Sequence, residues 1–218
     1  MINSQTLASV LKTLKENQIK CGIGGSYLLQ LYDLCDEPND IDFWVEPNDM
    51  QKVRLLFREY DEIIEKIQLP AQYHYKFRYF DMDIDFVACF ITRPNQHEYV
   101  YNIRPESVEI ITTSDGLDIP CTSLEDWYIV YKLLNREEKA SLIEKYIYKK
   151  NIVETNERLN RSIKDKGNVL PQRVTNDVNS FVWDNMQMRF EELYNIGECI
   201  YEKKNLCSPI KIDINGKM

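Results

Sequence analysis

The sequence has few of the residues on which several classes of enzyme depend. Among 218 residues there are only two histidines, His74 and His97, and neither lies near a serine or cysteine in a pattern typical of nucleophilic catalysis. The six cysteines are scattered singly, without the close pairs of thiolate zinc sites or the density of a disulfide scaffold. We therefore expect reduced thiols, and we expect neither a Ser-His nor a Cys-His nucleophile.

Positive charge and long apolar runs are also scarce. The formal net charge is -8, whereas non-specific binding to a nucleic-acid backbone needs a broad excess of Lys and Arg. No apolar run is long enough to cross a bilayer, and residues 1–6 lack the basic flank and apolar core of a secretory signal. The sequence predicts a cytoplasmic protein that makes no membrane contact and does not bind nucleic acid in bulk.

Enough apolar residues remain to build a full core, because 44% of the chain is hydrophobic. Apolar residues recur at helical spacing over residues 7–14 and again from residue 122 onward. Short β-prone runs occupy residues 19–23, 40–45, 73–79 and 82–90. We predict an α+β fold, with a mixed β-sheet and its covering helices over residues 1–121 and a helical domain over residues 122–218.

A glycine turn follows the strand predicted at residues 19–23. Gly24 and Gly25 let the backbone take positive φ and approach a ligand closely, and the helix that begins there offers free N–H groups. Ser26 can cap this helix or give its hydroxyl to a phosphate oxygen. Because a Gly-Gly-Ser sequence alone is more often a plain tight turn, this interpretation needs support from elsewhere in the chain.

An acidic loop leads into the strand predicted at residues 40–45. Alternation puts Asp40 and Asp42 on one face and the apolar residues at 41, 43 and 45 on the other. Two adjacent carboxylates repel each other, and a hard divalent cation is the usual reason to keep such a pair. A calcium loop or a solvated acidic turn is the alternative, but no glycine follows at the sharp-turn position and the alternation favours a strand.

A second pair of acids lies in a predicted hairpin. Residues 73–79 and 82–90 form its strands, and the chain turns near residues 80 and 81. Asp83 and Asp85 alternate with the apolar residues of the second strand, and edge charges that discourage aggregation are the structural alternative. If this strand neighbours residues 40–45 in one sheet, the carboxylates of both strands converge, as a two-metal site requires.

Together these motifs resemble the DNA polymerase β-like nucleotidyltransferase superfamily. The similarity is greatest to its small bacterial members, of the antibiotic-modifying or abortive-infection toxin type. It rests on Gly24-Gly25-Ser26 and the helix after it, on Asn39-Asp40-Ile41-Asp42, and on Ile84-Asp85-Phe86-Val87. The resemblance covers about residues 19–135, and the combination is specific where each part is not.

The resemblance implies a reaction and a set of acids. A nucleoside monophosphate would pass from a nucleoside triphosphate such as ATP to an acceptor hydroxyl, in a magnesium-dependent, two-metal mechanism. Asp40, Asp42 and Asp85 would be the catalytic residues and would hold two Mg²⁺ ions. Asp85 would also position and deprotonate the acceptor hydroxyl.

The same resemblance gives the glycine turn a role, because Gly24, Gly25 and Ser26 would hold the phosphates of the nucleotide. Asp83 competes with Asp85 for the third carboxylate position. Residues two apart on a strand are displaced by about 7 Å, so only one of the two can reach the metals. We favour Asp85, because two apolar strand residues follow it, as they follow the third acid of the family.

The acceptor stays open, since a small molecule, a tRNA end and a protein side chain all offer hydroxyls. A catalytically silent module is the alternative function. Such a module would bind a nucleotide or a partner, for example as one component of a toxin-antitoxin pair. The presence of all three acids favours the enzyme.

Three helical features are also predicted. An apolar stripe over residues 53–67 predicts a helix that ends before Pro70, and Thr122 with Glu125 fits a capping box at the start of the helical region. A last helix is expected around residues 174–202.

Two groups of basic residues are candidates for contact with a nucleotide or another anion. Lys132 lies off the buried stripe of its helix, and a solvated helix face is a better interpretation for it than contact with a nucleotide. Residues 145–166 are rich in Lys and Arg. They are interpreted first as a solvated face and second as a surface that attracts an anionic acceptor or a triphosphate.

Overall fold

The computed structural model of the chain describes residues 3–36, 38, 40–63, 69–93, 96–148, 152–165, 167–184 and 186–187. Its helices are α1 (Ser4–Glu16), α2 (Gly25–Leu31), α3 (Met50–Leu56), α4 (Leu124–Leu133), α5 (Glu137–Ile147) and α6 (Ile152–Lys164), with the short 3-10 turns η1 (Pro47–Asp49) and η3 (Pro105–Ser107). Its strands are β1 (Cys21–Ile23), β2 (Asp40–Val45), β3 (Asp61–Glu62), β4 (Ala71–Tyr79), β5 (Met82–Thr92), β6 (Tyr99–Tyr101), β7 (Glu109–Thr112) and β8 (Asp118–Cys121). A further helical segment covers residues 172–184.

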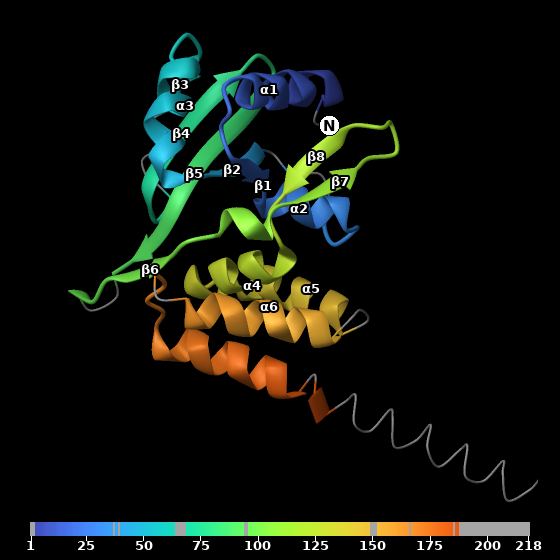
Figure 1. Ribbon diagram of the computed structural model, residues 1–218, viewed down its shortest axis with the longest axis vertical. Coiled ribbons are helices and arrows are strands. Elements are labelled where there is room, and N and C mark those ends of the chain that lie inside the picture. Colours follow the sequence, from blue (N-terminus) through green and yellow to red (C-terminus); the bar gives the residue numbers. More distant parts are fainter. Residues whose placement is uncertain are drawn as a thin grey trace, which may run out of the picture.

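The described strands form one eight-stranded mixed sheet in the order β3-β4-β5-β2-β1-β8-β7, with β6 paired to β5. The pairs β2/β5 and β1/β8 are parallel, and the other pairs are antiparallel. Helices α4, α5 and α6 lie on one side of the sheet, and residues 172–184 lie beyond α6 (Figure 1). The predicted α+β class, a mixed sheet with covering helices, is confirmed.

The central strands are buried because their apolar residues pack against aromatic neighbours. Phe43 of β2 stacks on Phe86 of β5, with ring centroids 5.4 Å apart. Phe57, just after α3, lies 4.8 Å from the ring of Phe86 and 6.0 Å from that of Phe77. Ring contacts of this kind stabilise a core beyond the area that they bury, so β2 and β5 are held rigidly side by side.

The helix predicted over residues 53–67 is wrong in its length. Helix α3 ends at Leu56, and Asp61 and Glu62 instead pair with β4 as the short edge strand β3. Tyr60 packs on Tyr79 of β4, with ring centroids 4.4 Å apart. Pairing of residues 61–62 with the open edge of the sheet therefore outweighs the helical spacing of the apolar residues. Residues 64–68 lie outside the described part of the chain.

The cap of α4 also differs from the prediction. Ser123 is the N-cap, and its Oγ accepts a hydrogen bond of 3.1 Å from the backbone N–H of Asp126. Thr122 instead joins the helix to the sheet, because its hydroxyl donates to the carbonyl of Ile23 (3.0 Å) and accepts from Trp127 Nε1 (2.7 Å). The capping signal is therefore correct in kind and displaced by one residue.

Every residue of helix α4 except Lys132 is buried. It contacts α2, α5 and α6. A buried hydrogen bond of 2.6 Å, from Tyr101 Oη to Asp126 Oδ1, ties it to strand β6. Strand β8 ends at Cys121 and α4 begins at Leu124. The domain boundary at residues 121 and 122 stays a prediction.

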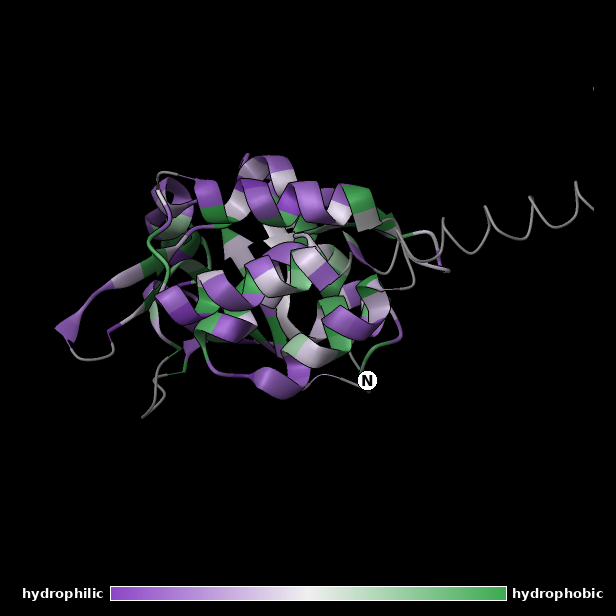
Figure 2. Cartoon of the chain, turned by 90° about the horizontal axis from the view of Figure 1, so that it is seen from below, coloured by the Kyte–Doolittle hydropathy of each residue, from purple (hydrophilic) through white to green (hydrophobic). Residues whose placement is uncertain are grey.

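Helices α1 and α5 are amphipathic, because each buries one apolar face: Leu7, Val10, Leu11 and Leu14 in α1, and Ala140, Ile143 and Ile147 in α5. Seen from below the view of Figure 1, the helices nearest the viewer carry both hydrophilic and hydrophobic residues (Figure 2). Of the predicted last helix, residues 174–184 are helical, and the part from residue 188 onward lies outside the described residues. No helix in the described part of the chain combines the length and the apolar character that a membrane span needs.

Candidate active site

Two neighbouring strands bring four carboxylates to one region of the sheet. Strands β2 and β5 are parallel, and their register pairs Asp40 with Asp83 and Asp42 with Asp85. Side chains in register on adjacent strands point to the same face and are separated by about 4.8 Å in the sheet direction. The sequence predicted that these carboxylates converge if the two strands are neighbours, and the strands are neighbours.

The glycine turn packs directly on one of these acids. Gly25 has φ +60, and a Cβ added to it would lie 1.7 Å from Oδ2 of Asp42. The backbone N–H of Gly24 donates to the carbonyl of Asp42 at 2.9 Å. A Cβ on Gly24 would lie 2.0 Å from Nε1 of Trp127. Both glycines are thus required by the packing of the protein itself, one against the acid and one against α4.

Burial and neighbouring charge act together on Asp42. Its pKa is raised from the ordinary value of 3.8 to about 7. Burial is the main cause, and the carboxylates of Asp40 and Asp85 add to it, while Arg136 and Lys139 act in the opposite direction. Negative charge is therefore concentrated here, and positive charge placed among these acids lowers the free energy of the site.

Strand β4 brings two basic side chains to the acids. Lys76 Nζ lies 3.0 Å from Asp40 Oδ2 and 3.4 Å from Asp85 Oδ2. His74 Nε2 lies 3.3 Å from the other oxygen of Asp85. Because Asp85 is only 7% exposed, these two side chains supply much of its immediate polar surroundings.

Asp83 has a different partner. Its carboxylate pairs with the guanidinium of Arg78, with 3.2 Å between Nη2 and Oδ2, and the two residues face each other across β4 and β5. Arg78 is 51% exposed, so this ion pair lies at the surface. Of the two candidates for the third acid, the register therefore sets Asp85 beside Asp42, and Asp83 beside Asp40 in an ion pair with Arg78.

A lysine from the helical layer reaches the glycine turn. Lys139 Nζ, on α5, donates to Ser26 Oγ at 2.6 Å and lies 5.5 Å above the ring of Tyr131. Ser26 does not cap α2, whose N-cap is Gly24 and has no side-chain cap. The hydroxyl predicted to face a phosphate is thus paired with a cation, and the turn carries a positive charge that the sequence did not predict.

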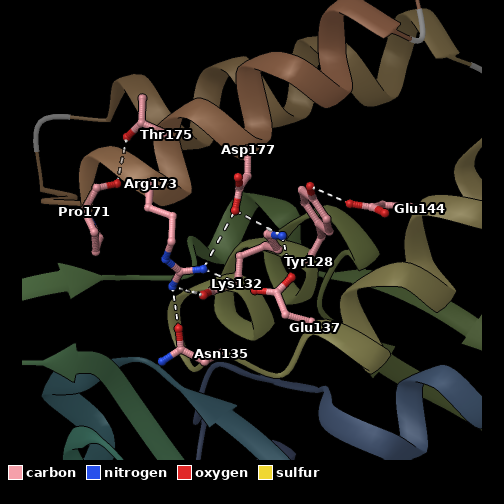
Figure 3. A network of polar contacts seen from close by, with 9 residues as sticks. All are labelled: Tyr128, Lys132, Asn135, Glu137, Glu144, Pro171, Arg173, Thr175 and Asp177. Carbon is pink, nitrogen blue, oxygen red and sulfur yellow. Dashed lines mark hydrogen bonds and ion pairs between the residues drawn. The ribbon is translucent and has the colours of Figure 1, made fainter.

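Lys132 is held inside a network of ion pairs (Figure 3). Its side chain is 11% exposed, and Nζ contacts Glu137 and lies 3.0 Å from Asp177 Oδ2. Arg173 joins the same network, donating to the carbonyl of Lys132 at 2.9 Å and to Asn135 Oδ1 at 2.7 Å. The solvated helix face predicted for Lys132 is therefore wrong, because this side chain fastens residues 172–184 to α4 and α5.

The basic stretch at residues 145–166 is also partly neutralised. Arg158 pairs with Glu109 and with Glu154. It lines a cavity of about 370 Å³ beside α6, whose charged lining consists of Arg104, Glu106, Glu109, Asp126, Glu154, Glu157, Arg158 and Arg161. Acids outnumber arginines in this lining, so the cavity does not favour an anion.

The acids have the donor chemistry of a magnesium site. Mg²⁺ takes oxygen ligands, and Asp40, Asp42 and Asp85 supply carboxylate oxygens from two adjacent strands. Burial, with a further contribution from the carboxylates of Asp40 and Asp85, raises the pKa of Asp42. Among the residues that the structure describes, no group of three or more His, Cys, Asp or Glu side chains already has metal-binding geometry. The ammonium of Lys76 lies between two of the three carboxylates.

Three basic residues of the site were missed at the level of sequence. His74 and Lys76 alternate with apolar residues on β4, and a two-residue turn after Tyr79 sets Lys76 opposite Asp85. That register was available from the sequence. Lys139 gives no such signal, because it lies 113 residues from Ser26 along the chain.

No protein-family model and no curated protein sequence matches this chain. Among solved structures, the chain is similar to a Thermotoga maritima protein assigned provisionally as a nucleotidyltransferase, with 19% identity and a TM-score of 0.49. That match covers 69% of this chain and 97% of the other. At this identity and TM-score the match assigns no activity.

Two resistance proteins are also similar in structure. The lincosamide antibiotic adenylyltransferase LnuA, in its lincomycin-bound form, matches at 12% identity and a TM-score of 0.45, over 65% of this chain and 96% of that one. The antibiotic-resistance factor ANT(2'')-Ia matches at 13% identity and a TM-score of 0.45, over 91% of this chain and 99% of that one. Like the first match, these two are similarities of structure at low sequence identity.

Proposed function

We propose that the chain is a nucleotidyltransferase that moves a nucleoside monophosphate from a nucleoside triphosphate to an acceptor hydroxyl. The observation that carries this proposal is the register of β2 and β5, which brings Asp42 and Asp85 together on one face with Asp40 beside them. Three converging carboxylates next to a glycine turn match the requirements of phosphoryl chemistry, in which positioning and charge neutralisation provide most of the catalysis.

Asp40, Asp42 and Asp85 would hold Mg²⁺, two ions in the active complex. When bound, Mg²⁺ neutralises the charge of the triphosphate and of the oxygens that enter and leave the transferred phosphorus. The residues of the chain hold these carboxylates in place before any ligand binds. Gly25 packs against Asp42, and the backbone of Gly24 is fastened to the same residue.

The triphosphate would lie against the glycine turn. Ser26 offers a hydroxyl there, and Lys139 offers an ammonium within hydrogen-bond distance of it. Phosphate oxygens accept strong, charge-assisted hydrogen bonds from such a cation. Lys139 would therefore exchange its contact with Ser26 for a contact with the phosphates when the nucleotide binds.

The chemical step conserves atoms and charge in a simple way. The acceptor oxygen attacks the α-phosphorus, the bond from that phosphorus to the oxygen bridging to the β-phosphorus breaks, and pyrophosphate leaves. Asp85 would take the proton of the acceptor hydroxyl as a general base. Its burial and the hydrogen bond that it accepts from Lys76 restrict its orientation.

The test is transfer of a labelled nucleotide to an acceptor in cell extract. The protein is incubated with extract, Mg²⁺ and each isotopically labelled triphosphate in turn, and mass spectrometry detects any molecule that gains a nucleoside monophosphate. We expect one acceptor class to gain the label with wild-type protein and not with Asp42→Asn. Transfer that is equal in the two proteins, or absent with every triphosphate, contradicts the proposal.

A further inference from the structure

We propose that Lys76 is an internal cation that occupies the space between Asp40 and Asp85 in the free protein, and that a divalent ion must displace its ammonium to use these two carboxylates fully. The inference rests on the proposed function, because it concerns the same acids. It adds a residue that sets how tightly the free site binds a metal.

The geometry of Lys76 is that of a bridging cation. Its Nζ contacts one oxygen of Asp40 and one oxygen of Asp85, at 3.0 and 3.4 Å. The Lys76 side chain is 10% exposed, so these contacts lie largely out of water. Each carboxylate oxygen that accepts a hydrogen bond from the ammonium is one oxygen fewer for a metal ion.

The position of Lys76 in the sheet explains why a long side chain is needed. Strand β5 lies between β4 and β2 in the sheet order, so Asp40 is two strands away from Lys76. Two strand spacings amount to about 10 Å. Lys76 faces Asp85 directly across β4 and β5, and its stem extends past this neighbour to reach Asp40.

Arg78 shows that this arrangement is specific to Lys76. Arg78 lies two residues further along the same strand and points to the same face. It pairs with Asp83, opposite it on β5. Arg78 therefore neutralises the acid opposite it, while Lys76 reaches Asp40 and Asp85.

Competition follows from linkage between the two cations. If the metal and the ammonium exclude each other from the same oxygens, the metal affinity is lowered by the strength of the contacts that Lys76 gives up. Hydrogen bonds to charged groups are strong enough to lower a binding constant about tenfold or more. Removing the ammonium should therefore tighten metal binding rather than weaken it, which is the opposite of the effect expected if Lys76 only held the acids in place.

The experiment measures binding of Mn²⁺ to the free protein by electron paramagnetic resonance of the unbound ion. Wild type, Lys76→Met, Arg78→Met and Asp42→Asn are compared. Arg78→Met is the matched control, because it removes the same charge from the same face of the same strand. We expect Lys76→Met to bind Mn²⁺ about tenfold more tightly than wild type, and Arg78→Met to bind as wild type does.

A second measurement uses the wild-type protein and does not depend on the folding of a variant. Chemical acetylation of lysines, followed by mass spectrometry, should label Lys76 faster when Mn²⁺ is added without nucleotide, because the displaced ammonium leaves its buried contacts. Lys145, an exposed residue of α5, serves as the internal reference. Unchanged labelling of Lys76 at saturating Mn²⁺ contradicts the inference.

The outcomes separate the two proposals. Binding of Mn²⁺ that requires Asp42, with no gain in Lys76→Met, overturns the role of Lys76 and leaves the proposed function standing. Absence of Mn²⁺ binding in all four proteins overturns this inference alone, because the proposed function places the two ions in the active complex with the nucleotide. Tighter binding of Mn²⁺ by Lys76→Met, together with unchanged binding by Arg78→Met, supports both proposals.

Discussion

A Cβ on Gly25 would lie 1.7 Å from Oδ2 of Asp42, so the backbone of the glycine turn packs directly against the carboxylate of Asp42. Gly25 also has a left-handed φ of +60. The turn and the acid are consequently positioned together. Movement of either one changes the geometry of both.

Gly25→Ala should lower the free energy of unfolding by more than the conformational cost of an alanine at positive φ. A left-handed conformation costs an L residue about 1–2 kcal/mol, and overpacking adds about 1–3 kcal/mol. Gly116 is the matched control, because it has φ +82 and open space around its Cβ position. In urea unfolding, we expect the free energy of unfolding of Gly116→Ala to fall only by the conformational cost. That of Gly25→Ala should fall by both the conformational cost and the overpacking cost, and this variant should also lose the binding of Mn²⁺. Equal losses in the two variants contradict the packed contact.

The raised pKa of Asp42 predicts a pH-dependent cost in the metal-free protein. The folded-state pKa is about 7 against an ordinary value of 3.8, so the folded protein holds a proton that the unfolded chain has released between these values. Stability should fall as pH rises through this window, and above pH 7 the full penalty should apply. The shift corresponds to at most about 4 kcal/mol.

Asp42→Asn removes this penalty and gives the test. In EDTA, the variant should gain stability over wild type as pH rises from 4 to 7, and the gain should level off above pH 7. Urea unfolding at intervals of one pH unit measures the difference. Two curves that run parallel across this range contradict the burial and the charge repulsion assigned to Asp42.

Lys139→Met should weaken nucleotide binding more than it slows the chemical step. Its ammonium is expected to hold the phosphates equally in the bound substrate and in the transition state, so its loss acts mainly on KM. The loss of one charge-assisted hydrogen bond raises KM about tenfold or more. Lys145→Met, on the exposed part of the same helix, is the control and should leave KM unchanged. A fall in kcat at constant KM argues against this role.

Local patterns in the sequence predicted the strands of the site correctly. Alternation in residues 40–45 and 82–90 identified β2 and β5 and the faces on which their acids lie. The hairpin of β4 and β5 was also predictable, because its turn is short and local. The register of this hairpin also implied that Lys76 pairs with Asp85, although this pairing was not among the predictions.

Contacts between distant parts of the chain were not predictable in the same way. The pairing of β2 with β5 joins strands separated by α3, β3 and β4, and no local pattern fixes such a neighbour. Lys139 reaches Ser26 only because α5 packs against α4 and α4 against α2. The end of α3 depends on an open sheet edge beside residues 61–62, which outweighs helical spacing. Tertiary structure decides each of these features.

The most direct test of the central claim compares Asp85→Asn with Asp83→Asn. The two residues lie on one strand and one face, and only Asp85 is in register with Asp42. Nucleotide transfer to the acceptor is measured with Mg²⁺ and saturating triphosphate, after circular dichroism has shown that both variants are folded. Loss of a general base lowers the rate by about 100-fold or more, so Asp85→Asn should be nearly inactive while Asp83→Asn stays close to wild type. Full activity in Asp85→Asn, or loss in Asp83→Asn alone, would contradict the account.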